Sequence, residues 1–358
     1  MRTYLENILP SGAPWGGPES VSFLSKFVSM LMEIRQYKED DPSVTLYCVE
    51  GPNPCIRCAK CQNFNWNEHL HEQLYHQYLT LSGIAFLTQW PSDAPLVITN
   101  ECIARIMDFA GLNYLDTNET TFESIKASID EGRPVLLTDS KGIDWTLIAG
   151  YDTTSDVQIL LDEHAAPHPF PESSPRALII TGFKPPRNGY AEEFSYQADI
   201  LKTGAGFLKS SESGFSAYDA LFNTLNNNPY FDQTDDASLL KLYQNIHNFV
   251  GMEAERRFFI ADTLTKHYYG LDTLGQGANN LLWLIGAIYM QTHDTCWHTW
   301  RLLGNPDLKY AADNAPLLRS LSVRQSILQD IKTFQKYDTL VYHLLKDAPT
   351  ASWLMPLA

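Results

Sequence analysis

The chain is poor in positive charge and has no basic cluster. It contains 26 lysine and arginine residues against 42 aspartate and glutamate residues, so its formal net charge is −16 at pH 7. The longest basic run is the pair Arg256-Arg257. Nucleic acids and anionic membrane surfaces attract proteins through clustered lysine and arginine. We therefore expect neither a nucleic acid nor a membrane as a partner.

Long hydrophobic runs are also missing. A membrane-spanning helix needs about 18 or more consecutive apolar residues, and the most apolar segment, LLWLIGAIYM at 281–290, is much shorter. That segment suits a buried helix instead. The first residues, MRTYLENILPSGAPWGG, lack the charged and then apolar pattern of a secretory signal. These absences predict a soluble protein that stays in the cytoplasm.

Cysteine is scarce, with six residues in the chain, which is too few for a disulfide scaffold. Four of the six nevertheless lie close together in the segment YCVEGPNPCIRCAKC, as Cys48, Cys55, Cys58 and Cys61. A loop can bring four thiolates onto one tetrahedral zinc ion, so this spacing predicts a structural zinc site. An iron–sulfur cluster is disfavoured because Asn65 stands where the ferredoxin pattern has its fourth cysteine. The alternatives are free thiols, or His69 or His71 in place of Cys48 as a ligand.

Hydrophobic periodicity predicts helices followed by an antiparallel sheet in the first half of the chain. One helix begins with an apparent capping box, Thr120 followed by Glu123. Short gaps between the later strands favour hairpins, which gives an α+β fold class. The predicted helices are 17–36, one within 67–86 that ends near Ser82-Gly83, 99–112 and 120–132. The predicted strands are 41–51, 134–139, 145–152, 157–163 and 176–183.

The pattern changes after KPPRNG at 184–189. Proline and glycine mark a boundary there, and the apolar spacing beyond it is helical. We therefore predict two domains, an α+β domain at 1–185 with the cysteine-rich insertion at 48–61, and an all-helical domain at 186–358. The helices predicted in the second domain are 191–209, 214–226, 236–268, 277–303 and 316–346.

Several short motifs resemble those of one family with a papain-like fold. They are GRPVLL at 132–137, IAGYD at 148–152, LSGIAF at 81–86 and GFSAYDALFNTL at 214–225. The family is the bacterial group related to the double-glycine-leader peptidases and to the butirosin biosynthesis protein H acyltransferase. The resemblance implies a cysteine at the start of the first helix and a histidine at the start of the strand that ends in Gly-Tyr-Asp. It also implies an aspartate or asparagine at the end of the next strand.

The chain departs from this pattern at the positions that carry the chemistry. The nucleophile position falls on Glu19 or Ser20, the histidine position falls on Asp144, and only Asp162 agrees. A carboxylate with an ordinary pKa of about 3.9 is a poor base for a hydroxyl group. Asp144 beside Asp162 would also place two like charges together. We therefore expect a non-catalytic protein that binds a small molecule or peptide in the cleft between the first helix and the sheet.

Two tryptophans are predicted to line this cleft. Trp90 and Trp145 supply apolar walls, while Asp93, Asp144 and Asp162 supply negative charge for an amine-bearing ligand. The alternative interpretation is that both indole rings belong to the core.

An enzyme is the other functional hypothesis. An acyltransferase or amide hydrolase of the butirosin type would use Ser20 or Cys102 as its nucleophile, with Asp162 as the orienting acid and His164 or His168 as the base. A third hypothesis is that the helical half forms a homodimer or docks on another protein.

Overall fold

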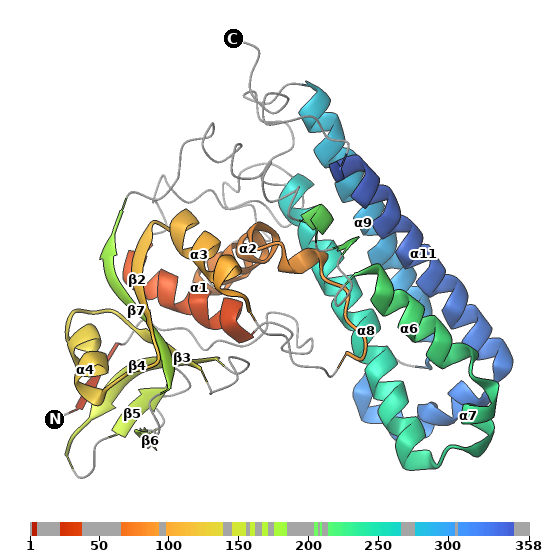
Figure 1. Cartoon of the computed structure of the whole chain (residues 1–358), viewed down its shortest axis with the longest axis horizontal. Helices are drawn as coiled ribbons and strands as arrows, with labels where there is room; N and C mark the ends of the chain where they lie inside the picture. The colour runs from red at the N-terminus through yellow and green to blue at the C-terminus, as the bar shows by residue number, and fades with distance from the viewer. Residues whose placement is uncertain are drawn as a thin grey trace. The chain divides into compact units, whose positions relative to one another are not determined.

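The structure is a computed structural model of the 358-residue chain (Figure 1). The strand predicted at 41–51 and most of the helix predicted at 191–209 lie outside the residues that it describes. The described residues are 2–5, 22–37, 66–92, 98–138, 145–154, 158–161, 167–170, 175–184, 204–206, 208–209, 214–265, 276–304 and 307–346.

The chain forms two compact units. The first comprises residues 1–78 and 95–189, and the second comprises residues 79–94 and 190–358. The segment 79–94 therefore belongs to the second unit although it comes from the first half of the sequence. The sequence predicted a helix that ends near Ser82-Gly83, as the helix does, but the only domain boundary it predicted lies at 185/186.

Within its described residues, the first unit contains an antiparallel sheet of seven strands. Six of them follow the order β2-β7-β3-β4-β5-β6, and β1 pairs with β4. The strands predicted at 134–139, 145–152, 157–163 and 176–183 are present as β3, β4, β5 and β7, while β1, β2 and β6 were not predicted. The bounds are β1 Arg2–Tyr4, β2 Leu112–Thr117, β3 Val135–Thr138, β4 Trp145–Asp152, β5 Gln158–Leu161, β6 Pro167–Pro169 and β7 Arg176–Phe183.

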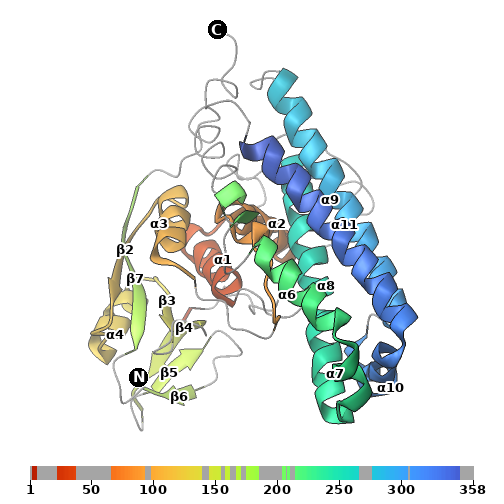
Figure 2. The same ribbon diagram turned by 45° about the vertical axis from the view of Figure 1, so that its right-hand side comes forward.

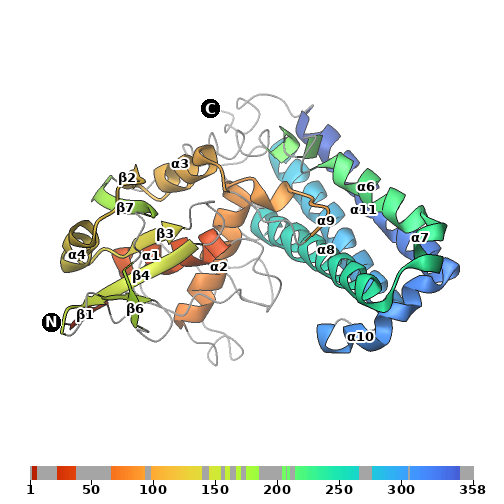
Figure 3. The ribbon, with the colours of Figure 1, turned by 60° about the horizontal axis from the view of Figure 1, so that its bottom comes forward.

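Side-chain alternation divides this sheet into two covered faces. On one face, Ile125 and Ile129 of α4 (Phe122–Asp130) join a buried cluster with Val135, Leu137 and Ile148. On the other face lies α1 (Ser22–Arg35), which contacts β4 and β3. Figures 1 and 3 show α1 with the sheet on one side and α2 (Trp66–Leu81) on the other. The sheet thus lies between α4 and α1.

Helix α1 is largely buried. Its apolar residues Phe23, Phe27 and Leu31 have no exposed surface, and the same holds for Ser29, whereas Lys26 is half-buried. Polar side chains on the buried faces of a helix need partners inside the protein.

The capping box at the start of α4 differs from the prediction. The capping box is formed by Thr121 and Ser124, not by Thr120 and Glu123. Thr121 has the extended backbone of an N-cap. Its side chain accepts from the backbone N–H of Ser124, and the Ser124 side chain accepts from the backbone N–H of Thr121, so two helix-end N–H groups are satisfied. Thr120 is buried instead.

The second unit is helical. Its long helices α8, α9 and α11 lie side by side, with α6 against α11 (Figure 2). Helices predicted at 214–226, 236–268, 277–303 and 316–346 correspond to α6, α8, α9 and α11. The bounds are η2 Ile84–Phe86, α6 Phe215–Asn226, α7 Asn228–Gln233, α8 Asp236–Thr263, α9 Gln276–Leu302, η4 Leu308–Tyr310, α10 Ala311–Asn314, η5 Ala315–Arg319 and α11 Leu321–Lys346.

The segment 281–290 was expected to be buried, and this was only half right. Ile285 and Tyr289 have no exposed surface, but Trp283 is 53% exposed, Leu284 is 40% exposed and Met290 is 37% exposed. Apolar content alone does not reveal how many sides of a helix are covered. Among the described residues, no helix is long and apolar enough to cross a membrane.

Candidate functional site

The start of α1 meets the start of β4. Phe23, the second residue of α1, places its ring edge against the indole of Trp145, the first residue of β4, with a centroid separation of 5.0 Å. This contact joins a helix N-terminus to a strand N-terminus within the first unit. It is the junction at which the resemblance places the nucleophile and the histidine.

The three residues predicted to form the site lie outside the described residues, but their neighbours lie inside. Ser20 precedes α1, Asp144 precedes Trp145, and Asp162 follows Leu161 of β5. Leu161 pairs with Ile148, the fourth residue of β4, so β5 runs towards the end of the sheet where β4 begins and ends opposite the middle of β4. The described neighbours of Ser20 and Asp144 are therefore at the start of β4, and that of Asp162 is about half a strand away.

Arg176 of β7 is a charged residue at the end of the sheet where β4 begins. Its guanidinium lies over the Trp145 ring, with the central carbon 5.7 Å from the ring centroid. Nε and Nη2 donate to the two carboxylate oxygens of Asp116 over 2.9 and 2.7 Å, and Nη2 also donates to Asn100 over 2.6 Å. The bidentate contact holds the guanidinium in one orientation. Sequence analysis missed Arg176, although it begins a strand that was predicted.

Trp145 itself packs as a core residue. Only 3% of its surface is exposed, because the indole lies between Phe23 and Arg176. Trp90 belongs to the second unit, where its ring contacts Phe249 at 6.0 Å between centroids. Asp93 lies outside the described residues. Each of the two tryptophans thus packs within its own unit.

Cys102 does not have the environment of an activated nucleophile. It lies in the first turn of α3 (Asn100–Phe109), where Thr99 is the N-cap and accepts a hydrogen bond from the backbone N–H of Cys102. Its side chain is buried, and burial raises the pKa of the thiol. Desolvation therefore outweighs the helix N-terminus, which by itself would favour the thiolate.

A buried histidine supplies partners for the polar residues of α1. His71 of α2 places Nε2 3.2 Å from Oγ of Ser29 and 3.4 Å from the carbonyl oxygen of Ser25. Burial lowers the pKa of His71 to about 4, so the ring is neutral at neutral pH. Ser29 has no exposed surface, so this serine–histidine pair cannot reach a substrate. We assign it a structural role.

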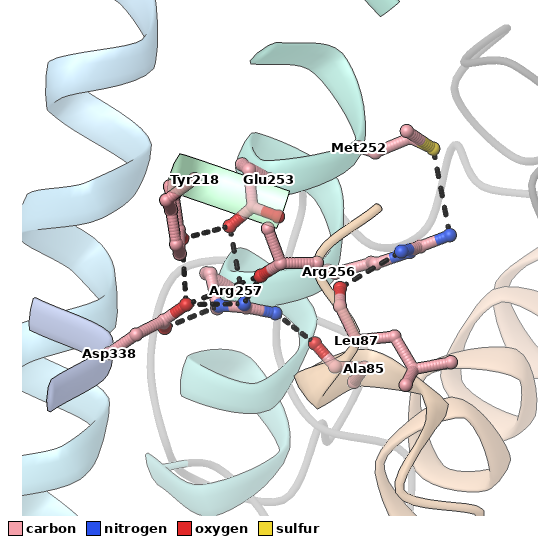
Figure 4. A network of polar contacts seen from close by, with 9 residues as sticks. Ala85, Leu87, Tyr218, Met252, Glu253, Arg256, Arg257 and Asp338 are labelled. Atoms are coloured by element: carbon pink, nitrogen blue, oxygen red, sulfur yellow. Dashed lines mark hydrogen bonds and ion pairs between the residues drawn. The ribbon is translucent and has the colours of Figure 1, made fainter. Parts of the chain in front are cut away.

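The strongest concentration of buried charge is in the helical unit. Arg257 of α8 makes a bidentate contact with Asp338 of α11, with Nε–Oδ1 and Nη2–Oδ2 distances of 2.9 and 2.7 Å (Figure 4). Its Nη2 also lies 2.8 Å from Oγ1 of Thr88 and 3.2 Å from Oε2 of Glu253, and its Nη1 donates to the carbonyl oxygen of Ala85. We call Arg257, Asp338, Glu253, Thr88 and Tyr218 the Arg257 network.

Tyr218 of α6 completes this network. Its hydroxyl lies 2.7 Å from Oδ2 of Asp338 and 3.1 Å from Oε2 of Glu253. Every member is at most 1% exposed. The adjacent Arg256 donates to the carbonyl oxygen of Leu87 over 2.9 Å. The two arginines together hold the segment Ile84–Thr88 on α8.

Comparison with known proteins adds no family: no family model, curated protein or solved structure matches the chain. Within the described part of the chain, no group of three or more histidine, cysteine, aspartate or glutamate residues could hold a metal ion. The predicted zinc ligands Cys48, Cys55, Cys58 and Cys61 lie outside that part.

Proposed function

We propose that the first unit is a papain-like binding protein without the catalytic cysteine and histidine, and that its ligand is a small molecule or peptide. The observation that carries this proposal is the contact between Phe23 and Trp145 at 5.0 Å. Papain-like enzymes activate a thiol by placing it at a helix N-terminus beside an imidazole. Here the same junction is flanked by Ser20 and Asp144.

The charges near this junction favour an amine-bearing ligand. Arg176 is already paired with Asp116 through two hydrogen bonds. Its charge is therefore balanced without Asp144 or Asp162. Two carboxylates placed together without a cation repel each other, and a bound ammonium group would relieve that repulsion.

The enzyme hypothesis is less well supported. Cys102 is buried and its thiol has a raised pKa, which opposes thiolate formation. His71 is held against α1 by Ser29 and Ser25. An acyltransferase or amide hydrolase acting through Ser20 would need a histidine beside that residue.

Restoring the missing pair tests the proposed arrangement. In a Ser20→Cys/Asp144→His variant, an imidazolium beside the new thiol should lower its pKa. We expect its alkylation by iodoacetamide at pH 6 to be at least about tenfold faster than in Ser20→Cys alone. Peptide mapping by mass spectrometry gives the rate at residue 20 separately from the native cysteines.

Asp152→His provides the matched control, since it makes the same change of charge at the opposite end of β4. Ser20→Cys/Asp152→His should react like Ser20→Cys alone. A Glu19→Cys series distinguishes the two positions that could correspond to the nucleophile. Equal rates in every variant, or acyl transfer by the unmodified protein, would contradict the proposal.

We also propose one structural zinc ion bound by Cys48, Cys55, Cys58 and Cys61, on the basis of their spacing in the sequence. Elemental analysis of the purified protein should find about one zinc per chain. Cys58→Ser should remove it, while Cys102→Ser should retain it. Iron together with acid-labile sulfide would support a cluster instead, and metal-free protein from zinc-supplemented cells would contradict both.

A further inference from the structure

The shorter hydrogen bonds of the Arg257 network go to Asp338 rather than to Glu253. Nη2 of Arg257 has two hydrogens, and its nearest acceptors are Oδ2 of Asp338 at 2.7 Å and Oγ1 of Thr88 at 2.8 Å. The single hydroxyl hydrogen of Tyr218 has its nearer acceptor in Asp338 at 2.7 Å. The hydroxyl of Thr88 is also directed at Asp338.

Glu253 has only the longer contacts with these donors. Its Oε2 lies 3.2 Å from Nη2 of Arg257 and 3.1 Å from the Tyr218 hydroxyl, and both groups have shorter contacts elsewhere. A buried carboxylate with too few donors is costly. A protonated Glu253 removes the problem, because it donates to the Tyr218 oxygen while Tyr218 donates to Asp338.

We infer that Glu253 is a buried proton-binding site and that release of its proton loosens the segment Ile84–Thr88. Ionised Glu253 would compete for Arg257, which lies one turn away on the same helix. Arg257 contacts Ala85 and Thr88 through the same guanidinium. Any shift of that group towards Glu253 weakens its hold on the segment.

Some of the groups around Glu253 raise its pKa and others lower it. The pKa of Glu253 is raised to about 7: burial is the largest cause and the charge of Asp338 adds to it, while Arg257, Arg256 and the hydrogen bond from Tyr218 oppose the rise. Helix α9 contributes no cation among its groups near this site; Tyr289 and Cys296 are both fully buried there, and their own pKa values are raised. The titratable or charged groups facing the site are Tyr218 of α6, Arg256 and Arg257 of α8, Tyr289 and Cys296 of α9, and Asp338 of α11.

The pH range follows from these directions. Folded Glu253 holds its proton up to about pH 7, whereas an exposed glutamate loses it near its ordinary pKa of 4.5. The closed form therefore binds more protons than the opened form between these values. Opening becomes easier as the pH rises through that range and levels off above it. This inference concerns the helical unit alone and does not rest on the proposed function of the first unit.

Hydrogen exchange of the full chain tests the inference. The N–H groups of Phe86 and Leu87 donate to the carbonyl oxygens of Gly83 and Ile84, so both report on opening of the segment. After correction for intrinsic exchange, their opening constants should rise about tenfold per pH unit between pH 5 and 7. In Glu253→Gln, which keeps a neutral donor, the opening constants should not depend on pH.

Infrared difference spectroscopy gives a second readout. The spectrum of the unmodified protein minus that of Glu253→Gln at pH 6 should contain the C=O stretch of a protonated carboxylic acid. Asp330→Asn is the matched control, because Asp330 is a buried acid on α11 that contacts His298 and Thr299 instead. It should leave the exchange of Phe86 and Leu87 unchanged.

Three outcomes would overturn the inference. The first is an equal pH dependence of exchange in the unmodified protein and in Glu253→Gln. The second is the absence of the carboxylic acid band. The third is a Glu253→Gln protein that does not fold, since an amide should substitute for a neutral acid but not for an ion-paired carboxylate.

Discussion

Replacing Arg257 by methionine should lower the free energy of unfolding of the helical unit by about 3–5 kcal/mol. Arg257 has no exposed surface, and its guanidinium contacts Asp338, Thr88 and Ala85. The variant would leave Asp338 buried without its cation and the Ala85 carbonyl without its donor. An uncompensated buried charge is the costliest part of this loss.

Chemical denaturation followed by hydrogen exchange in α8 and α11 measures this effect within the helical unit. The matched control is Lys309→Met, which removes the cation of the exposed pair Lys309–Asp307 in the same unit. Exposed pairs contribute about 1 kcal/mol or less. An Arg257→Met variant as stable as Lys309→Met would show that the network does not hold this unit together.

A double variant separates the ion pair from the packing. Adding Asp338→Leu to Arg257→Met removes the unpaired carboxylate, so the double variant should recover part of the lost stability. Additive losses would place the cost in the contacts of Arg257 with Ala85 and Thr88.

The packing of α1 against α2 should weaken as the pH falls from about 6.5 to 4. Burial lowers the pKa of His71 to about 4 in the folded protein, from its ordinary value of 6.5. In this range the unfolded chain binds a proton that the folded chain excludes, so stability is fully present above pH 6.5 and is lost towards pH 4. The shift corresponds to about 3 kcal/mol.

Exchange of the α1 amide hydrogens measures this loss, since a two-unit chain need not unfold in one step. In His71→Gln, the loss of protection towards pH 4 that comes from His71 should be absent, because glutamine does not titrate. His168→Gln is the control, as His168 is exposed on β6. The same pH dependence of α1 protection in the unmodified protein and in His71→Gln would contradict the prediction.

Glu33, which also lies on α1, should have the opposite effect on the pH dependence of stability. It is buried, and burial raises the pKa of its carboxyl, so its contribution decreases as the pH rises. The comparison between the unmodified protein and His71→Gln removes this background because Glu33 is present in both. Glu253 also acts in the opposite direction, but it lies in the other unit.

Local sequence patterns were enough to find the elements with strong periodicity. The bounds of β4 and β7 agree with the predicted strands 145–152 and 176–183, and α9 lies within one residue of the prediction at either end. Their apolar runs are bounded by turn residues, so short-range preferences and tertiary packing agree. Glycine at position 150 within β4 also has a tertiary reason, because a Cβ there would collide with the Thr3 carbonyl of β1.

The missed strands are those held by distant partners. β2 has an irregular pattern of burial, and its structure depends on pairing with β7, more than 60 residues later. β6 consists of Pro-His-Pro and pairs only with β5 among the described residues. Neither sequence favours a strand by itself, so only the sheet specifies them.

The sequence alone determined the acidic character of the chain, the helix-and-sheet order of its first half and the helical character of its second half, because these depend on composition and near neighbours. Tertiary structure buries Arg256 and Arg257, which the sequence shows only as the longest basic run. The partners of Arg257 are far away in the chain, at Ala85, Thr88 and Asp338. Whether a charge is solvated or buried, and whether an acid keeps its proton, depends on such partners, and no local pattern contains them.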